Sequence, residues 1–436
     1  MNDTLSRLPS EPADRLTGPF VRFLRIEAMA GVVLLNATIV SIVLANTAWS
    51  AQFLAFWDMP AGFRLDDVEL YRSLKHWIND GLMTLFFFVI ALELKRELVL
   101  GELRNPRNAA FPLAAALGGM IVPAGLFVFL VDGGAGASGW GTVMSTDTAF
   151  VVGCLAILGG RTPPGLRLFL LSLAIFDDVG AILVVAISYS GTLDWIALGL
   201  AAFGLAVTAG MARLGVRNTL VYFVIGGGVW LAIDASGVHA TLTGVILGLM
   251  TPARSWVSDR RLQAILGRVT AHPPGEHSSG GATARRDLRR ARVATREAMS
   301  PIERLEFALH PWVAFAVMPL FALANAGVSI APTSFDRTLT VAVFFAFVLG
   351  KPAGVVLFSF LAEKLRAGIR PNDLPWSVLI AGSLLTGIGF TMALFIANLA
   401  FTPALLDSVK LGVMGASVLS AAAGFLALAW LTSPRR

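Results

Sequence analysis

The chain has 436 residues, of which 56% are hydrophobic and only 14% charged, and its mean hydropathy is +0.73. A soluble domain carries about 25% charged residues, so this composition excludes a soluble protein and indicates one that crosses a membrane many times. In such a protein the net charge of +6 belongs to loops at one membrane face, not to a nucleic-acid surface. The single cysteine, Cys154, excludes an intrachain disulfide.

The sequence predicts an all-α polytopic membrane protein, because a run of about 20 apolar residues crosses a bilayer core as a helix. Residues 1–26 form a polar N-terminal tail, residues 27–432 a single transmembrane domain, and residues 433–436 the C-terminus. The expected spans, twelve in all, lie near residues 27–48, 76–98, 109–131, 140–158, 166–188, 194–212, 218–234, 238–250, 306–328, 338–360, 377–397 and 410–432.

The connection between the first two spans, residues 58–72, joins turn residues to a partial alternation of apolar and polar residues. This pattern predicts a small β-hairpin outside the membrane, with a plain interfacial loop as the alternative.

The positive charges favour one membrane face. If both termini lie on that face, 28 of the 34 lysines and arginines lie there too, and five lie opposite. Because basic loops stay in the cytoplasm, we expect both termini to be cytoplasmic.

The connection at 251–305 is the one long insertion. It contains a Pro/Gly/Ser-rich hinge at 273–281 and an arginine-rich stretch at 285–296. We expect either a solvated, partly disordered cytoplasmic loop or a helix whose arginines lie on anionic lipid. The arginines of this stretch are Arg285, Arg286, Arg289, Arg290, Arg292 and Arg296.

Two adjacent carboxylates, Asp177 and Asp178, lie halfway along the fifth span. A charge at the centre of a membrane helix costs about 2.5–3.5 kcal/mol on insertion scales. Two adjacent carboxylates there therefore indicate a specific structural or functional role. Either neighbours neutralise both as structural groups, or the two form an ion or proton site. Neighbours on a helix point about 100° apart, which predicts two distinct roles.

Two spans are expected to be interrupted at mid-membrane. Span 4 contains the polar run 145–148, including Asp147, whose side chains compete with the backbone for hydrogen bonds. Span 11 contains the glycine-rich run 386–391. Irregular backbone survives at this depth only where protein buries it or a watery cavity lines it. One interrupted span in each half therefore points to a transporter site between inverted repeats, with glycine packing in span 11 as the alternative.

Lys351 lies in the middle of span 10, too deep to reach the interface easily. A buried ammonium needs a counter-charge, so we expect it to pair with Asp177 or Asp178. Neutralising a helix end is the alternative role.

The buried groups suit a hard monovalent cation. Carboxylates, threonine hydroxyls and freed carbonyls are the oxygen ligands that sodium or lithium prefers. Two nearby carboxylates also resist being ionised together, so one site can hold either protons or a cation. Exchange of a cation for protons requires at least this competition for one site.

Nine motifs, in order, resemble those of the NhaA family of bacterial sodium/proton antiporters, and the resemblance runs from about residue 20 to 432. The motifs are 77–80 (WIND), 92–98 (LELKREL), 145–150 (STDTAF), 173–182 (LAIFDDVGAI), 236–241 (SGVHAT), 310–313 (HPWV), 324–329 (ANAGVS), 350–352 (GKP) and 387–391 (GIGFT).

The resemblance implies a protein of the bacterial inner membrane in which spans 4 and 11 are unwound and cross, and spans 3–5 and 10–12 form an inverted pair. It implies Asp178 as the main cation ligand, with Asp147 and Thr146 beside it. It also implies that Asp177 pairs with Lys351 and exchanges protons. Sodium or lithium would be exchanged for more than one proton, electrogenically and without a cofactor.

The resemblance further implies activation by alkaline pH. The matching residues are Glu93, Arg96, Glu97, Glu306, His310 and His239. Ordinary interfacial ion pairs, or for His239 a role at a helix start, are the alternatives. Phe307 departs from the family, which often has histidine there, and the 251–305 loop is unusually long. The 58–72 region is similar to the family's dimer contact, so a homodimer is expected.

Two rival classes fit parts of the pattern. An intramembrane aspartyl protease needs facing carboxylates, one of them in a Gly-Asp motif, and the chain contains no Gly-Asp dipeptide. A sodium-coupled organic anion symporter on a related fold would want a larger cavity with cationic contacts, of which Lys351 supplies one. The sequence is therefore interpreted as that of a secondary transporter and not of an enzyme.

Overall fold

The computed structural model describes residues 27–65, 68–134, 136–189, 191–216, 218–271, 282–328 and 335–433. The predicted N-terminal tail, the predicted hinge at 273–281 and residues 434–436 lie outside the described residues.

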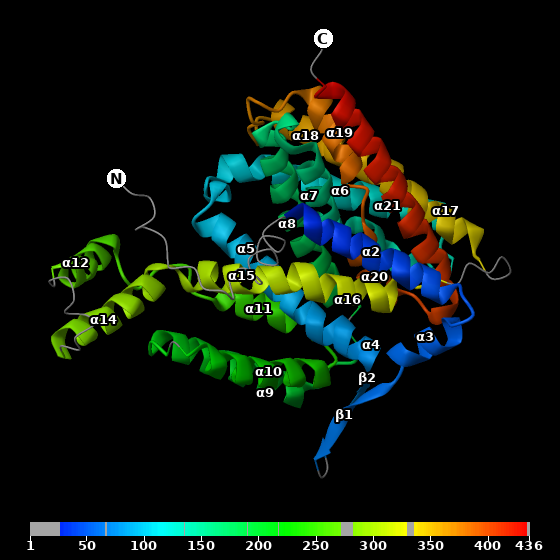
Figure 1. Ribbon diagram of the computed structural model, residues 1–436. Helices are drawn as coiled ribbons and strands as arrows, with labels where there is room; N and C mark the ends of the chain where they lie inside the picture. Colours follow the sequence, from blue (N-terminus) through cyan, green and yellow to red (C-terminus); the bar gives the residue numbers. More distant parts are fainter. Residues whose placement is uncertain are drawn as a thin grey trace. The chain divides into compact units, whose positions relative to one another are not determined.

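The chain divides into two compact units (Figure 1). The first unit comprises residues up to Leu82, Arg107–Tyr189 and the chain from Pro311 onward. Its elements are α2 (Glu27–Ala45), α3 (Ser50–Trp57), β1 (Pro60–Leu65), β2 (Val68–Ser73), α4 (Leu74–His76), the π-helix η1 (Trp77–Leu82), α6 (Pro106–Val131), the 3-10 helix η3 (Ala137–Met144), α7 (Thr148–Leu158), the 3-10 helix η4 (Gly159–Arg161), α8 (Pro164–Ser188), the π-helix η5 (Val313–Val317), α16 (Met318–Asn325), α17 (Arg337–Phe345), the π-helix η6 (Ala346–Gly350), α18 (Lys351–Lys364), α19 (Trp376–Leu385), α20 (Phe390–Ala400) and α21 (Pro403–Leu431).

The second unit comprises Met83–Pro106 and Ser190–His310. Its elements are α5 (Met83–Val99), the 3-10 helix η2 (Glu102–Arg104), α9 (Trp195–Arg213), α10 (Thr219–Ala235), α11 (Leu242–Met250), α12 (Asp259–Thr270), α14 (Ala282–Ala298) and most of α15 (Pro301–Trp312).

Several of these elements, alone or joined into continuous helical runs, are long and apolar enough to cross a membrane. Among the described residues eight satisfy that test, or ten when the bent pairs α2–α3 and α19–α20 each count as one span. The seventh and eighth predicted spans correspond to the shorter helices α10, of 17 residues, and α11, of 9 residues.

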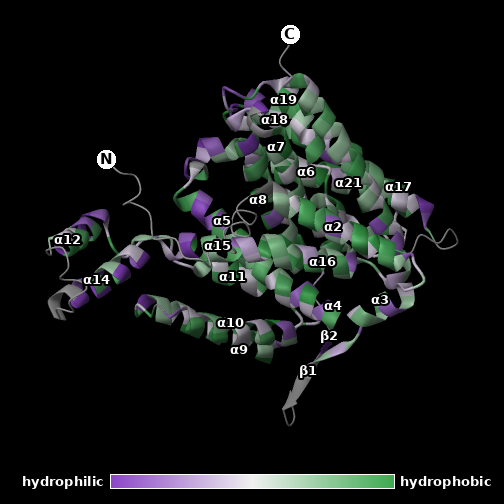
Figure 2. Ribbon diagram, viewed as in Figure 1, coloured by the Kyte–Doolittle hydropathy of each residue, from purple (hydrophilic) through white to green (hydrophobic). Residues whose placement is uncertain are grey.

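Large apolar side chains face outward from these helices. Ile187 is 80% exposed, Ile196 87% and Phe223 74%. Such exposure suits lipid and not water, and Figure 2 shows hydrophobic residues along α9, α10 and α21. The fold is therefore the predicted all-α polytopic membrane protein.

The helices begin where their sequences provide a cap or a proline. Asp194 accepts hydrogen bonds from the amides of Ile196 and Ala197 at the start of α9, at 2.8 and 3.3 Å. These bonds satisfy amides that have no partner within the helix. Pro164 and Pro403 lie in the first turns of α8 and α21, where a missing amide proton costs nothing.

The region at 58–72 contains the predicted hairpin. Strands β1 and β2 pair antiparallel, with Pro60 opposite Ser73 and Leu65 opposite Val68. The preceding helix α3 was not predicted. Its axis is bent by 120° from that of α2, so it turns away from the first span.

The π-helices η5 and η6 have a common cause. Each ends two residues before a proline, Pro319 and Pro352 respectively. Because proline has no amide proton, a carbonyl about one turn earlier loses its donor, and the helix widens locally. In the second case the widened turn leads directly into Lys351.

Helices α6 and α18 touch through glycines. A Cβ added to Gly354 would overlap the carbonyl oxygen of Gly118, and a Cβ added to Gly118 would overlap that of Gly354. Only glycine at both positions allows this close approach. The neighbouring Gly119 lies beside Val355, Lys351 and Asp177, so the glycine contact brings α6 against the buried charges.

We predict that Gly354→Ala lowers the free energy of unfolding by about 1–3 kcal/mol, because the methyl group would overpack two backbones. Thermal unfolding of the purified protein in detergent measures the change. Gly125→Ala is the matched control on α6, since an added Cβ there meets nothing within 4 Å. Equal unfolding temperatures for the two variants would contradict the contact.

Candidate functional site

The predicted interruption of span 4 lies at residues 145–147. The 3-10 helix η3 ends at Met144, three residues follow outside any helix, and α7 begins at Thr148. Asp147 is the N-cap of α7, where its Oδ1 accepts from the amide of Phe150 at 3.4 Å. The polar run therefore replaces helical hydrogen bonds with side-chain bonds, as the composition predicted.

The predicted interruption of span 11 lies between α19 and α20, whose axes differ by 49°. A Cβ on Gly387 would overlap the side chain of Ser420, and one on Gly389 would overlap the ring of Phe347. These glycines therefore let the unwound segment lie against α21 and η6.

The two interruptions cross each other. The amide of Asp147 donates to the carbonyl of Ile388 at 2.7 Å, and the amide of Thr391 donates to Asp147 Oδ2 at 2.9 Å. The hydroxyl of Thr391 donates to the same oxygen, and that of Thr146 lies 3.4 Å from the carbonyl of Thr386. Each break thus satisfies backbone groups of the other, which the bilayer would leave without partners.

Three buried side chains meet beside this crossing. Lys351 Nζ lies 3.1 Å from Asp177 Oδ2, and the hydroxyl of Thr146 donates to the same carboxylate oxygen at 2.6 Å. The Lys351 ammonium also donates to the carbonyl of Met144, the last residue of η3. The side chains of Lys351 and Asp177 are both 0% exposed. Of the two partners left open by the sequence, the structure places Lys351 on Asp177.

Asp178 follows Asp177 on α8 and is 3% exposed. Because neighbours on a helix point about 100° apart, its carboxylate belongs to a different side of α8. Both carboxylates act electrostatically on Lys351, and the two distinct roles stay a prediction.

Several buried oxygens near the break are open to a ligand. Among the buried side-chain oxygens of the described residues that have no hydrogen-bond partner, four lie in or beside the break: Thr142 Oγ1, Ser145 Oγ, Thr148 Oγ1 and Asp177 Oδ1. Buried polar atoms are rarely left without a partner. Hydroxyl and carboxylate oxygens are the ligands of a hard cation, so this donor set fits sodium or lithium.

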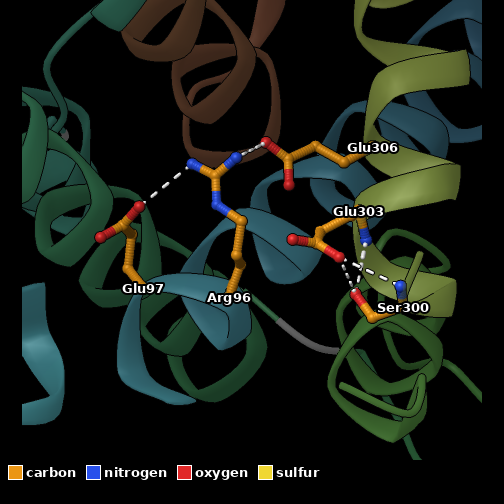
Figure 3. A network of polar contacts seen from close by, with 5 residues as sticks. All are labelled: Arg96, Glu97, Ser300, Glu303 and Glu306. Atoms are coloured by element: carbon orange, nitrogen blue, oxygen red, sulfur yellow. Dashed lines mark hydrogen bonds and ion pairs between the residues drawn. The ribbon is translucent and has the colours of Figure 1, made fainter. Parts of the chain in front are cut away.

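A second cluster joins α5 to α15 in the other unit (Figure 3). Arg96 Nη1 lies 2.5 Å from Glu306 Oε1, and Arg96 Nη2 lies 3.0 Å from Glu97 Oε1. Glu93 and His310 both act electrostatically on Glu306. The structure therefore brings together five of the six residues predicted for pH regulation.

His239 is the sixth residue, and it lies apart from that cluster. It is half-buried in the turn between α10 and α11. The start of α11 packs near Thr84, since a Cβ on Gly244 would overlap the carbonyl of that residue. Thr84 precedes Arg96 by 12 residues of helix, which is about 18 Å. His239 thus lies near the opposite end of α5.

Sequence reasoning missed some members of the crossing. Thr391 was recognised only as part of the glycine-rich motif, yet it donates twice to Asp147. The carbonyls of Met144 and Ile388 were missed because any residue type supplies a carbonyl. The signal for Thr391 was its place directly after the predicted break.

The fold and this site together define a class of protein. Two broken helices that cross in a membrane domain, with carboxylates and a lysine buried at the crossing, are typical of ion-coupled transporters with inverted repeats. A family model described as Na+/H+ antiporter 1 matches residues 21–428. The chain belongs to this antiporter family.

Relatives that match over nearly the whole of both chains carry the name of the same family. The chain is 72% identical to the "Na(+)/H(+) antiporter NhaA" of Rhizobium meliloti (strain 1021), over the whole of both chains. It is 58% identical to "Na(+)/H(+) antiporter NhaA 1" of Acidiphilium cryptum (strain JF-5), over 97% of this chain and 94% of that one. It is 48% identical to the "Na(+)/H(+) antiporter NhaA" of Rhodopirellula baltica (strain DSM 10527 / NCIMB 13988 / SH1), over 100% of this chain and 99% of that one.

We predict that Lys351→Ala lowers the free energy of unfolding by about 3–5 kcal/mol, because it leaves Asp177 buried without its counter-charge. Thermal unfolding in detergent measures the loss. Lys364→Ala, at the exposed end of the same helix, is the matched control. Adding Asp177→Asn to the Lys351→Ala variant should restore part of the loss. If the double variant is as unstable as the sum of the single ones, the pair does not interact.

Proposed function

We propose that this protein is a secondary active transporter that exchanges cytoplasmic sodium or lithium for external protons, electrogenically and under control of pH. The observation that carries the proposal is the meeting of Asp177, Lys351 and Thr146 at the crossing that also holds Asp147. Buried charges are retained in membranes mainly at ion and proton pathways.

Asp178 is proposed as the main cation ligand, with Asp147 and Thr146 contributing oxygens beside it. The burial of Asp178 and the open hydroxyls around the break support this role. Asp147 Oδ2 already accepts two hydrogen bonds from Thr391, so its carboxylate is held in one orientation. Such preorganisation favours a small ion of fixed coordination distance.

Asp177 and Lys351 are proposed to exchange the protons. Asp177 Oδ2 is engaged by both Lys351 and Thr146. A proton arriving at Asp177 would compete with Lys351 for this carboxylate, so protonation and the ion pair exclude each other. A cation at the neighbouring Asp178 would favour release of protons by simple repulsion. Because the site holds either the cation or protons, export of the cation is coupled to entry of protons.

The exchange is proposed to move net charge, because more than one proton enters for each cation that leaves. The membrane potential then contributes about 2.3 kcal/mol per net charge per 100 mV. An inner membrane that is negative on the cytoplasmic side would therefore drive sodium out even without a pH difference.

The Arg96 cluster is proposed to sense pH on the cytoplasmic side, with His239 as a further group. Three carboxylates and one histidine surround a single guanidinium there, so proton loss changes the charge balance of the cluster. Its cytoplasmic position follows from the excess of basic residues on the face that carries both termini.

Two partners complete the proposal. A homodimer would form through β1 and β2, since a two-stranded hairpin leaves both outer edges unpaired. Anionic lipid would lie at the basic insertion between residues 251 and 305, whose arginine-rich stretch forms the helix α14.

The organic anion symporter is the weaker candidate. Its main support in the sequence was Lys351 as a contact for an anion. That ammonium is buried against Asp177 and the carbonyl of Met144, so binding an anion would require breaking the ion pair.

We predict that Asp178→Asn abolishes exchange, because an amide lacks the negative charge that holds the cation. The test uses proteoliposomes with an imposed proton gradient, to which sodium, lithium, potassium or an organic anion is added separately. Wild-type protein should collapse the gradient with sodium or lithium. Exchange at the wild-type rate in the variant would show that Asp178 is not the cation ligand. A response of the wild-type protein to the organic anion alone would favour the symporter.

We predict that Glu306→Ala moves the pH profile of exchange toward lower pH by about one unit, because removal of a negative charge eases proton loss from its neighbours. The maximal rate should be retained. Glu303→Gln, on the same helix outside the Arg96 cluster, is the control and should keep the wild-type profile. Loss of exchange at every pH would show that Glu306 belongs to the transport site itself.

A further inference from the structure

The long insertion is folded. Helices α12 and α14 pack against each other and form a helical pair. Figure 2 shows that both carry many hydrophilic residues, unlike the neighbouring membrane helices. Of the two alternatives that the sequence left for this connection, the structure has the helix at 285–296, since these residues lie within α14.

The two faces of α14 are chemically opposite. Asp287, Ala291, Ala294 and Ala298 are buried or half-buried, at the spacing of one helix face. On the other side lies an arginine stripe formed by exposed residues at the same spacing. The members of this stripe are Arg285, Arg289, Arg292 and Arg296.

The stripe extends over 11 residues of helix, which is about 16 Å. The side chains of Leu288 and Val293 flank it and are 41% and 51% exposed. The other two arginines of the helix lie off the stripe, and one of them, Arg290, pairs with Asp287 at 3.6 Å. A row of positive charges with apolar flanks suits a flat array of anionic groups.

The place of α14 in the chain identifies that array as lipid. The helix ends at Ala298, and the membrane span Pro301–Asn325 begins three residues later. Ser300 lies between the two and caps α15, because its amide and hydroxyl both donate to Glu303 Oε2, at 3.0 and 2.7 Å, and its hydroxyl accepts from the amide of Glu303 at 3.3 Å (Figure 3). This reciprocal cap fixes the start of the span, and only Met299 and Ser300 separate it from the end of α14.

Two ion-pair contacts lead from the stripe to Arg304 on α15, the helix that also carries Glu306. Arg296 Nε lies 3.9 Å from Glu297 Oε1, and the same oxygen lies 3.2 Å from Arg304 Nη1 on α15. The side chain of Glu297 is only 9% exposed. A phosphate that engages Arg296 would draw this guanidinium away from Glu297 and so alter the contact between Glu297 and Arg304. Glu306, the partner of Arg96, lies two residues further along α15.

We propose that the arginine stripe binds anionic headgroups of the surrounding membrane and that this binding stimulates exchange through the Glu297–Arg304 contact and α15. The proposal rests on the exchange function proposed above. In this proposal the insertion takes no part in transport itself. It makes the rate of exchange depend on the content of anionic lipid in the surrounding membrane.

The test compares exchange in vesicles of phosphatidylcholine with exchange in vesicles that also contain phosphatidylglycerol. The double variant Arg289→Gln/Arg292→Gln removes half of the stripe. Arg286→Gln/Arg290→Gln removes the same charge from the same helix off the stripe. Wild type and the off-stripe variant should be stimulated by phosphatidylglycerol. The stripe variant should need a higher content of that lipid, by about fivefold per arginine at low salt.

A second readout separates binding from coupling. In nanodiscs, phosphatidylglycerol should slow trypsin cleavage at α14 in the wild type and in Glu297→Gln. Exchange by Glu297→Gln should nevertheless no longer respond to the lipid. Fast cleavage in both lipids would show that the stripe does not bind the surface.

Three results would overturn the proposal: equal lipid responses of the two double variants, stimulation of the wild type in phosphatidylcholine by inorganic phosphate, or exchange that proceeds at the same rate in both lipids. Absence of any exchange by the wild type in either lipid would instead contradict the proposed function.

Discussion

The buried ion pair between Lys351 and Asp177 is the interaction on which the rest of the structure depends. Removing two charges from water costs several kcal/mol per ion, and the attraction offsets this only when the geometry is good and other hydrogen bonds complete it. Thr146 and the carbonyl of Met144 supply those bonds. The pair therefore requires α8, α18 and the break of span 4 to meet at one point, and the glycine contact between α6 and α18 allows it.

In the crossing of the broken helices, the atoms that complete the fold are also those of the proposed site. In lipid every backbone group needs a partner within the protein, and each break provides partners for the other. The unwinding in turn frees hydroxyls and carboxylate oxygens that a continuous helix would direct elsewhere. The site that we propose for a small cation therefore lies where the fold would otherwise be weakest, and the polar residues are concentrated there.

Helix α15 combines two roles in the second unit. Its first turn is fixed by Ser300 and Glu303, next to the basic helix α14, and its middle carries Glu306 against Arg96. Contacts near a membrane surface are sensitive to pH, salt and lipid charge. Both sets of contacts lie on one helix, which continues along the chain into the span that ends at Asn325.

The sequence by itself determined the class of fold, the places of both helix breaks and the hairpin, because apolar length, local hydrogen-bond competition and turn residues are properties of short segments. It also singled out Asp147, Asp177, Asp178 and Lys351, since a charge in an apolar run is conspicuous without a structure. Only the tertiary structure decided that Lys351 pairs with Asp177, that Thr391 holds Asp147 and that the arginine-rich stretch is a helix packed on α12. Those outcomes depend on which distant segments meet, and the cost of burying a polar group can be weighed only when its partner is known.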